Sequence, residues 1–491
     1  MRRSTALTAA AAAVAGTLLF PGAALAQDDP PTLESLADGL SKVTDEGNLT
    51  WVIVGTVLVF FMQAGFAFLE IGLSRGKNSG AGIAKVLVNF SIAALVWWAV
   101  GFGFAFGGDG TILGDKGFLF GFGDEIGGTA SALYGETVGG GTSAFFIFQF
   151  MFAAVSLAIV WGSTLERIKF AVYPIYAVVF SALIYPLIAH WGFGGGLFAE
   201  LGNGVQDFAG SSVVHLTGAT GALAACILLG PRKGKYGPDG KPRAIPGHNM
   251  PLVGLGVLIL WLGWFGFNGA STLGTADGRF AEVLLVTNLG AAAGVVGAML
   301  ALALTGRSLD VGMIGNGAIA GLVAITAPSG YVEFWAAPII GLVGGIIVVF
   351  GVFAIDKYID DPVGATSAHG LAGIWGTLAC GLFTSDRLAA YNGIGDPGLF
   401  YSGSFFQLGS QALAVLLTFA VVFVISFAVF YLIKITIGLR VDDDSEDAGL
   451  DIAEHGMYGY PEQFIPAPEL VGYGALPQAV VPQAGKSEVP A

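Results

Sequence analysis

Charged side chains are scarce in this chain: Asp, Glu, Lys and Arg make up 11% of its 491 residues, against about 25% in an ordinary soluble domain. A soluble protein covers its surface with polar side chains, so this composition argues against a soluble protein. Basic residues are scarcer than acidic ones, 21 against 35, which disfavours nucleic-acid binding because clustered Lys and Arg must neutralise phosphates. The two cysteines are too few for a disulfide scaffold.

Hydrophobic residues, by contrast, make up 54% of the chain, and there are 77 glycines. Crossing a bilayer takes about 20 apolar residues per helix, because lipid offers the backbone no hydrogen-bond partner. Eleven segments approach or exceed that length: 49–73, 80–107, 143–163, 168–190, 211–230, 250–274, 281–305, 311–327, 332–354, 363–384 and 406–438. The eighth and tenth are short and glycine-rich, and they are the weakest of the eleven. The sequence therefore predicts an all-α polytopic membrane protein with eleven transmembrane helices, in which glycines allow close helix packing.

The first residues have the pattern of a secretory signal peptide. Two arginines precede an apolar stretch over 6–20, and an Ala-Leu-Ala triplet ends at Ala26. A cleaved signal peptide over 1–26 leaves an extracytoplasmic N-terminal segment over 27–48. The alternative is an uncleaved first helix, which is the weaker interpretation because the apolar stretch is shorter than about 20 residues.

The basic residues indicate the orientation of the spans. With the N-terminus outside and eleven crossings, 15 of the 19 basic residues that follow the signal peptide fall inside, as the positive-inside rule requires. These are Arg75, Lys77, Lys85, Arg167, Lys169, Arg232, Lys233, Lys235, Lys241, Arg243, Arg307, Lys357, Lys434, Arg440 and Lys486. We predict a multi-pass protein of the cell membrane, with a transmembrane domain over 49–438 and a cytoplasmic tail over 439–491.

Both cysteines belong to a pattern that occurs twice. Asp-x7-His-x10-Cys recurs at an offset of 154 residues, in the fifth and tenth predicted spans. The two copies are Asp207, His215 and Cys226, and Asp361, His369 and Cys380. Repeats that are five spans apart have opposite membrane orientations. We therefore predict an inverted repeat of five plus five helices and a long eleventh helix, with a substrate site near the midplane.

The two repeated histidines lie inside predicted spans, where an ionisable side chain is costly and points to a functional site. Pseudo-symmetry would bring His215 and His369 together from opposite halves. Two neutral imidazoles offer a donor and an acceptor edge, which suits a small polar molecule such as water or ammonia. Two other interpretations stay open: a histidine pair that serves packing alone, and a metal or haem site, which lacks further ligands at a suitable spacing. The cysteines are expected to pack as small apolar residues.

Aromatic residues form two clusters that also contain polar groups. One covers residues 148–152, and the other covers residues 261–268, with Ser271 one turn later. Aromatic faces beside a hydroxyl can bind a small cation by cation–π attraction, worth about 1–2 kcal/mol when the site is desolvated. Packing or an interfacial aromatic belt is the alternative for any single ring.

These motifs in combination resemble the ammonium transporters of the Amt/Mep/Rh family, and in particular the bacterial Amt type. The stretches that carry the resemblance are Asp207–Gly210 leading to His215, Trp264–Asn268 with Ser271, Asp360–Pro362 leading to His369, Phe68–Glu70, Arg75–Asn78 and Gly438–Val441. They extend over residues 50–450, nearly the whole mature chain. The combination is specific, although each motif alone is weak.

The resemblance implies a homotrimer with a separate pore in each subunit. It implies pore histidines at His215 and His369, a stacked phenyl gate at Phe152 and Phe267, an outer recruitment site at Ser271 with Phe152, and a structural carboxylate at Asp207. Ammonium would be recruited, deprotonated and passed as ammonia along an apolar pore, while its proton follows a relay of its own. The resemblance implies a transporter rather than an enzyme, and it implies no cofactor or metal.

One position departs from the family's pattern. The recruitment tryptophan normally stands directly before a glycine-rich run, but here Phe193 precedes Gly194–Gly196 and the tryptophan is Trp191. Either Phe193 supplies a weaker cation–π face, or Trp191 turns into the site. The affinity of the outer site depends on which of the two holds.

The tail carries a further resemblance. Gly449–Asp451 and His455–Gly456 resemble the family's C-terminal motif, which implies that the tail over 439–491 is regulatory and that a cytoplasmic PII signalling protein is its partner. Residues beyond about 462 are rich in Pro and Gly, and an unstructured, solvated end is the alternative there.

Other functions remain as alternatives to transport. One is an ammonium sensor with little conductance, and another is an Rh-like channel for neutral gases. Ser271 and the aromatic clusters favour the Amt type over the Rh type. A membrane redox enzyme ranks last, because two isolated histidines are too few to place its cofactors. Within the spans, the histidines and Asp207 are expected to be nearly the only ionisable groups that can handle ammonium.

Overall fold

The computed structural model describes residues 32–464, and the regular structure in that part of the chain is helical, with only isolated β-bridges. The predicted signal peptide, residues 1–26, and the end of the predicted tail, residues 465–491, lie outside the described residues. The chain divides into two compact units, one up to Gly47 and one from Asn48 onward. The first unit contributes the first turns of helix α2, and the second contains the other described helices.

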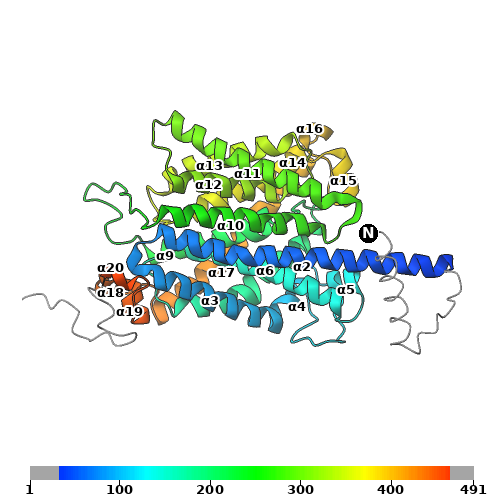
Figure 1. The fold of residues 1–491 in the computed structure, drawn as a ribbon, viewed down its shortest axis with the longest axis horizontal. Helices are drawn as coiled ribbons and strands as arrows, with labels where there is room; N and C mark the ends of the chain where they lie inside the picture. The colour runs from blue at the N-terminus through cyan, green and yellow to red at the C-terminus, as the bar shows by residue number, and fades with distance from the viewer. Residues whose placement is uncertain (1–31, 465–491) are drawn as a thin grey trace, which may run out of the picture. The chain divides into compact units, whose positions relative to one another are not determined.

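Long helices make up most of the second unit (Figure 1). The continuous ones are α2 (Leu33–Leu73), α3 (Ser79–Val96), α6 (Gly140–Gly162), α10 (Met250–Gly269), α11 (Arg279–Leu304), α12 (Val311–Thr326), α13 (Ala336–Ile355) and α17 (Phe406–Thr436). Wide π-helical turns join other pieces end to end: α3 to η2 (Trp97–Gly101) and α4 (Phe102–Phe106), α7 (Val172–Val179) to η3 (Phe180–Ile184) and α8 (Tyr185–Gly192), η5 (Ser211–Leu216) to α9 (Thr217–Leu229), and η9 (Thr366–Leu371) to α14 (Ala372–Phe383). Short helices are α5 (Gly128–Tyr134), α15 (Asp386–Asn392), α16 (Leu399–Ser402), α18 (Asp443–Ala448), α19 (Leu450–His455) and α20 (Pro461–Phe464).

Nine helices in the described part of the chain are long and apolar enough to cross a membrane. The two predicted spans without a counterpart among these nine are the eighth and the tenth, which are also the two weakest in the sequence. The eighth corresponds to α12, an apolar helix of 16 residues, and the tenth corresponds to η9 with α14. Both segments are helical, and the total of eleven crossings stays a prediction.

Helix α2 is longer than the first predicted span. It begins at Leu33 rather than at residue 49, inside the predicted N-terminal segment. A helix that has already formed gains one hydrogen bond for each residue added. Glu34, Ala37 and Leu40 are good helix formers, so the apolar helix extends into this polar sequence.

Glycines allow α11 and α13 to approach each other to backbone contact. A Cβ atom added at Gly345 of α13 would overlap the carbonyl oxygen of Gly294 in α11. A Cβ atom added at Gly341 would overlap the carbonyl oxygen of Gly290 in the same way. Membrane helices use small residues at their contacts because lipid provides no hydrophobic driving force for association. The expected structural role of glycine is confirmed at these positions.

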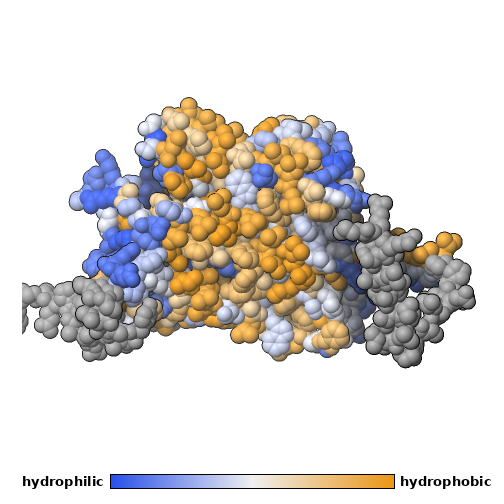
Figure 2. Space-filling model, viewed as in Figure 1, coloured by the Kyte–Doolittle hydropathy of each residue, from blue (hydrophilic) through white to orange (hydrophobic). Residues whose placement is uncertain are grey.

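Large apolar side chains lie exposed on the outward faces of several helices. Leu87 of α3 and Leu258 of α10 are each 64% exposed, and Val424 of α17 is 66% exposed. Figure 2 shows hydrophobic residues over the middle of one face of the helices, with hydrophilic residues gathered toward the ends. Such a surface is stable against lipid or another apolar surface rather than against water. These features fit a multi-pass membrane protein.

The tail packs against the start of α3. The Asp451 carboxylate accepts a hydrogen bond from the backbone N–H of Ala81 at 2.9 Å, and Lys77 donates to the backbone carbonyl of Glu446 at 2.8 Å. In Figure 1, α18 and α19 lie at the same end as the loop before α10. Lys233 of that loop donates its backbone N–H to the Glu446 carboxylate at 2.7 Å. The segment that resembles the family's C-terminal motif is therefore a packed part of the fold.

Candidate functional site

A carboxylate eight residues earlier in the chain positions His215. Asp207 accepts four backbone hydrogen bonds at the start of η5: on Oδ1 from Gly210 and Ser211, both at 2.8 Å, and on Oδ2 from Ser212 at 2.9 Å and Val213 at 3.0 Å. Amides at the start of a helix otherwise lack partners. Gly210 has a φ angle of 113°, and a Cβ atom there would lie 2.6 Å from Val214, so the turn into η5 requires glycine.

The second copy of the repeated pattern has a similar local structure. Asp361 accepts hydrogen bonds from the backbone N–H of Gly364 at 3.1 Å and of Thr366 at 2.8 Å, at the start of η9. Gly364, five residues before His369, also has a positive φ angle, 76°. A side chain, Ser163, donates a further hydrogen bond to this carboxylate at 2.8 Å. The repeated sequence therefore gives a repeated cap and turn before each histidine.

The two histidines contact each other deep inside the protein. The distance between the Nδ1 atoms of His215 and His369 is 3.2 Å, and the rings lie 5.3 Å apart at an angle of 18°. Their exposed fractions are 0% and 4%. One Nδ1 must donate and the other must accept, so the rings are opposite tautomers. The Nε2 atom of His215 has no partner in the protein, which leaves it able to meet a guest molecule.

Aromatic rings cover His215 on two sides. Trp264 stacks on its imidazole with the centroids 5.0 Å apart at 17°, and Phe267 lies 5.5 Å away. Phe267 is itself stacked on Phe152, with the centroids 4.1 Å apart at 17°. Trp264 is fixed by a hydrogen bond from its Nε1 to the Thr326 hydroxyl at 2.8 Å. The predicted gate residues and the predicted pore histidines thus lie next to each other in space.

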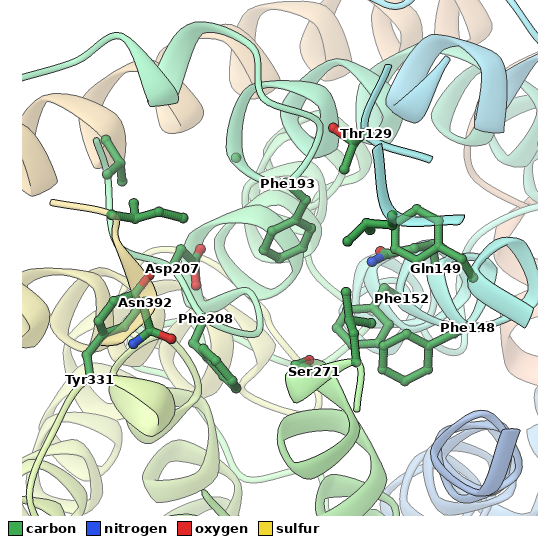
Figure 3. A pocket seen from close by; sticks show the side chains of 16 residues that line it. Thr129, Phe148, Gln149, Phe152, Phe193, Asp207, Phe208, Ser271, Tyr331 and Asn392 are labelled. Carbon is green, nitrogen blue, oxygen red and sulfur yellow. The ribbon is translucent and has the colours of Figure 1, made fainter. Parts of the chain in front are cut away.

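A cavity of about 230 Å³, called the aromatic cavity below, lies on the other side of the stacked phenyl rings. Its lining includes Thr129, Phe148, Gln149, Phe152, Phe193, Asp207, Phe208, Ser271, Tyr331 and Asn392 (Figure 3). The Ser271 hydroxyl donates to the carbonyl oxygen of Phe267 at 2.7 Å. Its oxygen therefore keeps lone pairs that can accept a hydrogen bond from a guest. The cavity combines aromatic faces with a few polar groups, which suits a small cation.

Phe193, rather than Trp191, borders the aromatic cavity. The Phe193 ring lies 6.4 Å from the Phe152 ring, nearly perpendicular to it at 86°. The Trp191 indole instead donates its N–H to the carbonyl oxygen of Ile112 at 3.1 Å and packs on Phe198 at 5.6 Å. Of the two arrangements expected for this position, the structure therefore has the one with a phenylalanine face.

Asp207 borders the same cavity, but its oxygens are occupied by the four backbone amides. Burial raises the pKa of Asp207 to about 6, and the backbone hydrogen bonds oppose that shift. The group is therefore mainly a carboxylate at pH 7. A negative charge held in place beside the cavity favours cations there without ligating them directly.

A second large cavity, of about 900 Å³, lies at the other end of the site and is called the charged cavity below. Its lining includes Arg232, Lys235, Arg307, Asp356 and Asp361. The charged side chains and the volume fit a water-filled mouth.

Four polar residues that line the aromatic cavity are not among the site residues predicted from the sequence. They are Thr129, Gln149, Tyr331 and Asn392, which lie on α6, in the short helices or in the connections. Of these four, only Gln149 could have been found from the sequence, because it stands inside the predicted aromatic cluster over 148–152. The other three come from segments whose approach to the site depends on the tertiary fold.

Glu70 of α2 and Lys85 of α3 show that one expectation was wrong, namely that the spans contain almost no other ionisable groups than the histidines and Asp207. The two side chains form an ion pair and are only 3% and 2% exposed. The histidines and Asp207 are therefore not nearly alone as ionisable groups within the predicted spans. The signal was present, because both residues lie inside predicted spans, but Lys85 appeared to be one more basic residue near the cytoplasmic face.

The repeated cysteines are buried and unpaired. The Cys226 thiol donates to the carbonyl oxygen of Ser163 at 3.3 Å, and Cys380 packs beside Tyr331 and Phe208. Their expected role as small buried residues is confirmed. In residues 32–464, no group of three or more His, Cys, Asp or Glu side chains is placed to hold a metal ion.

Comparison with known proteins gives a consistent result. Residues 50–460 match the profile of the Ammonium Transporter Family. The chain is 42% identical over 452 residues to "Ammonium transporter Amt2" of Archaeoglobus fulgidus, covering 89% of this chain and 92% of that protein. It is 34% identical over 424 residues to "Ammonium transporter" of Bacillus subtilis, covering 85% of this chain and 99% of that protein.

Solved structures resemble the fold over a similar length. One is "Sensor Amt Protein", with a TM-score of 0.77 and 36% identity, covering 84% of this chain and 100% of that chain. Another is the crystal structure of Candida albicans Mep2, with a TM-score of 0.73 and 30% identity, covering 82% of this chain and 88% of that chain.

Proposed function

Because this chain belongs to the ammonium transporter family, we propose that it carries ammonium or ammonia across the cell membrane through a pore built around His215 and His369. The observation that carries this proposal is the contact of the two buried imidazoles, Nδ1 to Nδ1 at 3.2 Å. The stacked rings of Phe152 and Phe267 separate this pair from the aromatic cavity. A shared hydrogen bond in an apolar passage suits a neutral guest that can both donate and accept.

Recruitment takes place in the aromatic cavity. Ammonium has four N–H donors and a positive charge, so it can donate to the free lone pairs of Ser271 while it lies against Phe152 and Phe193. The fixed carboxylate of Asp207 raises the local concentration of cations.

Deprotonation is the step that separates ammonium from other cations. Moving a bare charge past stacked phenyl rings is costly, because no ligand replaces its water. Ammonium can avoid this cost by releasing a proton, and potassium cannot. Ammonia then passes the phenyl rings and moves along the imidazoles of His215 and His369, which offer a donor edge and an acceptor edge.

The membrane arrangement is part of the proposal. We infer eleven crossings, because α12 and the η9–α14 pair are helical although they fall outside the nine clear spans. With the N-terminus outside, the basic loops and the tail face the cytoplasm. The two caps before the histidines support an inverted repeat, and the exposed apolar side chains of the helices fit lipid and a homotrimer contact. The packed tail is the proposed regulatory element, and a PII protein is its proposed partner.

A sensor is the second candidate function. The specific observation that favours it is the similarity to the structure named "Sensor Amt Protein", at 36% identity. A sensor would bind ammonium in the same aromatic cavity and pass little of it.

Electrophysiology on solid-supported membranes tests the proposal. Proteoliposomes that contain the full chain would be exposed to equal jumps of ammonium and of potassium. We expect a current or an internal pH change with ammonium alone. Equal responses to both cations would refute the selective pore, and saturable ammonium binding without flux would favour the sensor. His215→Ala and His369→Ala should abolish flux or change selectivity, and unaltered behaviour of both variants would return the histidines to packing.

A further inference from the structure

An ion pair lies inside the helix bundle, between α2 and α3. Glu70 Oε2 is in direct contact with Lys85 Nζ, and the side chains are 3% and 2% exposed. Both residues belong to helices that are apolar enough to span a membrane. Withdrawing two charges from water has a large cost, which their attraction offsets only in part. Ionisable side chains at such positions commonly belong to ion or proton pathways.

A small void lined by polar side chains adjoins the pair and is called the polar void below. Its volume is about 10 Å³, which is about enough for one water molecule. Gln63, Asn89 and Trp161 line it together with the ion pair. Each of these three side chains is buried and has polar atoms without a partner in the protein: Gln63 Nε2, Asn89 Nδ2 and Oδ1, and Trp161 Nε1. A water molecule in the void would bridge these groups to the ion pair.

Glu70 also borders the route from the histidines to the charged cavity. A second void, again of about 10 Å³, is lined by Glu70, His369 and Asn316. Asn316 also lines the charged cavity. Gly162 of α6 leaves room for the carboxylate, since a Cβ atom there would lie 3.3 Å from Glu70 Oε1. The carboxylate thus stands between the polar void and the end of the pore that leads from His369 to the charged cavity.

Helix α6 connects the polar void with the aromatic cavity. Gln149 and Phe152 line the aromatic cavity, whereas Ala154, Leu157 and Trp161 of the same helix line the polar void. From Gln149 to Trp161 the helix rises by about 18 Å, at about 1.5 Å per residue. Gln149 Oε1 is a further buried atom without a partner. Buried polar groups without a partner therefore lie at both ends of this stretch of α6, Gln149 beside the aromatic cavity and Trp161 beside the polar void.

We propose that Glu70 and Lys85 form a proton-transfer site beside the pore, which carries the proton that ammonium releases while ammonia passes the histidines. This inference rests on the proposed transport function. Ammonium breaks one N–H bond on the side of the aromatic cavity, and the proton reaches Glu70 and forms an O–H bond beside the Lys85 ammonium group. The O–H bond then breaks toward the charged cavity, where the proton recombines with ammonia. The pair regains its starting charges, and one positive charge has crossed.

A purely structural ion pair is the competing explanation. Replacing a buried ion pair by uncharged groups of similar size is often neutral or stabilising. A structural pair therefore predicts that an uncharged variant transports normally. The proton-transfer site predicts instead that the current is lost while the flux of neutral ammonia persists.

The double variant Glu70→Gln/Lys85→Met distinguishes these explanations, because it keeps the side-chain lengths and leaves no unpaired buried charge. Full-length protein in proteoliposomes would receive ammonium jumps, with the current measured on solid-supported membranes and the ammonia flux measured as the uptake of isotope-labelled ammonium. We expect the current to fall about 100-fold, at the lower end of what a positioned proton acceptor contributes. Ammonia flux should stay at the wild-type level. The control is Glu46→Gln/Lys42→Met, which neutralises an exposed acid–base pair on the same helix and should retain both signals.

Three results would overturn the inference. They are a wild-type current in the double variant, a joint loss of current and ammonia flux in a folded double variant, and a wild-type protein that carries ammonia without current. The last result would leave the proposed transport function intact, whereas a wild-type protein with neither signal would refute that function itself. If the double variant fails to fold, the exchange Glu70→Lys/Lys85→Glu keeps one acid and one base. A folded exchange variant should lose the current and keep the ammonia flux, because its carboxylate at position 85 no longer borders the second void. A wild-type current in this variant would again overturn the inference.

Discussion

The Asp207 carboxylate allows a sharp test of how the chain holds His215 in place. In Asp207→Asn, one oxygen keeps its two backbone hydrogen bonds, and the other is replaced by an NH2 group that cannot accept any. All four backbone amides are bonded to the carboxylate at 2.8–3.0 Å in the wild type, and the two that face the new NH2 group then lose their partner. In Asp207→Ala all four lose it. We expect both variants to be less stable than the wild type, with Ala below Asn.

The magnitude follows from the number of donors that are left unpaired. A buried unpaired donor costs about 1–3 kcal/mol, so Asp207→Asn should lower the free energy of unfolding by about 2–6 kcal/mol. Asp207→Ala has twice as many unpaired donors, but it opens space next to the aromatic cavity. Water can enter from that cavity and satisfy some of them, so the Ala variant should lie near the lower end of its range, at about 4 kcal/mol or somewhat more.

Thermal unfolding in detergent and the ammonium current of proteoliposomes measure the two effects. Asp310→Asn is a matched control, because Asp310 caps α12 through a single exposed hydrogen bond, from Met313 at 2.8 Å. Asparagine is about as good a cap as aspartate there, so this variant should unfold at the same temperature as the wild type. The reasoning would be refuted if Asp207→Asn unfolded at the same temperature as the wild type, or if it proved less stable than Asp207→Ala.

Three further perturbations have defined outcomes. Phe193→Trp should lower the ammonium concentration for half-saturation about threefold, because indole is the stronger cation–π face; an unchanged value would separate this ring from recruitment. Gly345→Ala should destabilise the protein by about 1–3 kcal/mol through overpacking against α11, whereas Gly409→Ala, where a Cβ atom meets open space, should be neutral or stabilising in the same unfolding assay. For Asp360, burial opposes ionisation, but the hydrogen bond and charge of Arg232 and the charge of Arg167 lower its pKa from 3.8 to about 2. Its ionised form therefore stabilises the fold above pH 3.8, by about 2 kcal/mol, and that stability is lost as the pH falls through about 2. An acid titration of Asp360→Asn should lack this loss, and an unchanged acid profile would contradict the assignment.

Local patterns were the most predictable part of the site. Asp207 and His215 belong to one short segment, so their spacing alone indicates a cap followed by a functional side chain, and the copy at Asp361 and His369 strengthens the interpretation. The neighbouring positions of Phe152 and Phe267, which lie on different helices, entered the expectations through the family resemblance. For two positions that no repeat relates, spacing along the chain carries no information about a contact between their helices.

The remaining features depend on tertiary packing. Whether Trp191 or Phe193 faces the aromatic cavity is decided by the carbonyl oxygen of Ile112, which accepts the indole N–H. Glu70 and Lys85 lie on separate helices, and the hydropathy of a span does not tell which of its faces is buried. Hydropathy alone does not predict the crossings at α12 and α14 for a related reason, since a short helix can span only where its neighbours permit it.

The shared hydrogen bond of His215 and His369 also limits how protons can move through the pair. Suppose that a proton enters at the bare Nε2 of one ring and leaves from the Nε2 of the other: both rings then finish as the reversed tautomers. A second proton from the same side would meet a donor where it needs an acceptor. Turning a ring over about its Cβ–Cγ bond would not restore the first state, because it exchanges Nδ1 with a ring carbon rather than with Nε2. His215 is in addition held between Trp264 at 5.0 Å and the ring of His369 at 5.3 Å. In the proposed pore, the pair would therefore pass any number of neutral molecules, but only one proton in a given direction until a proton moves back through it the other way.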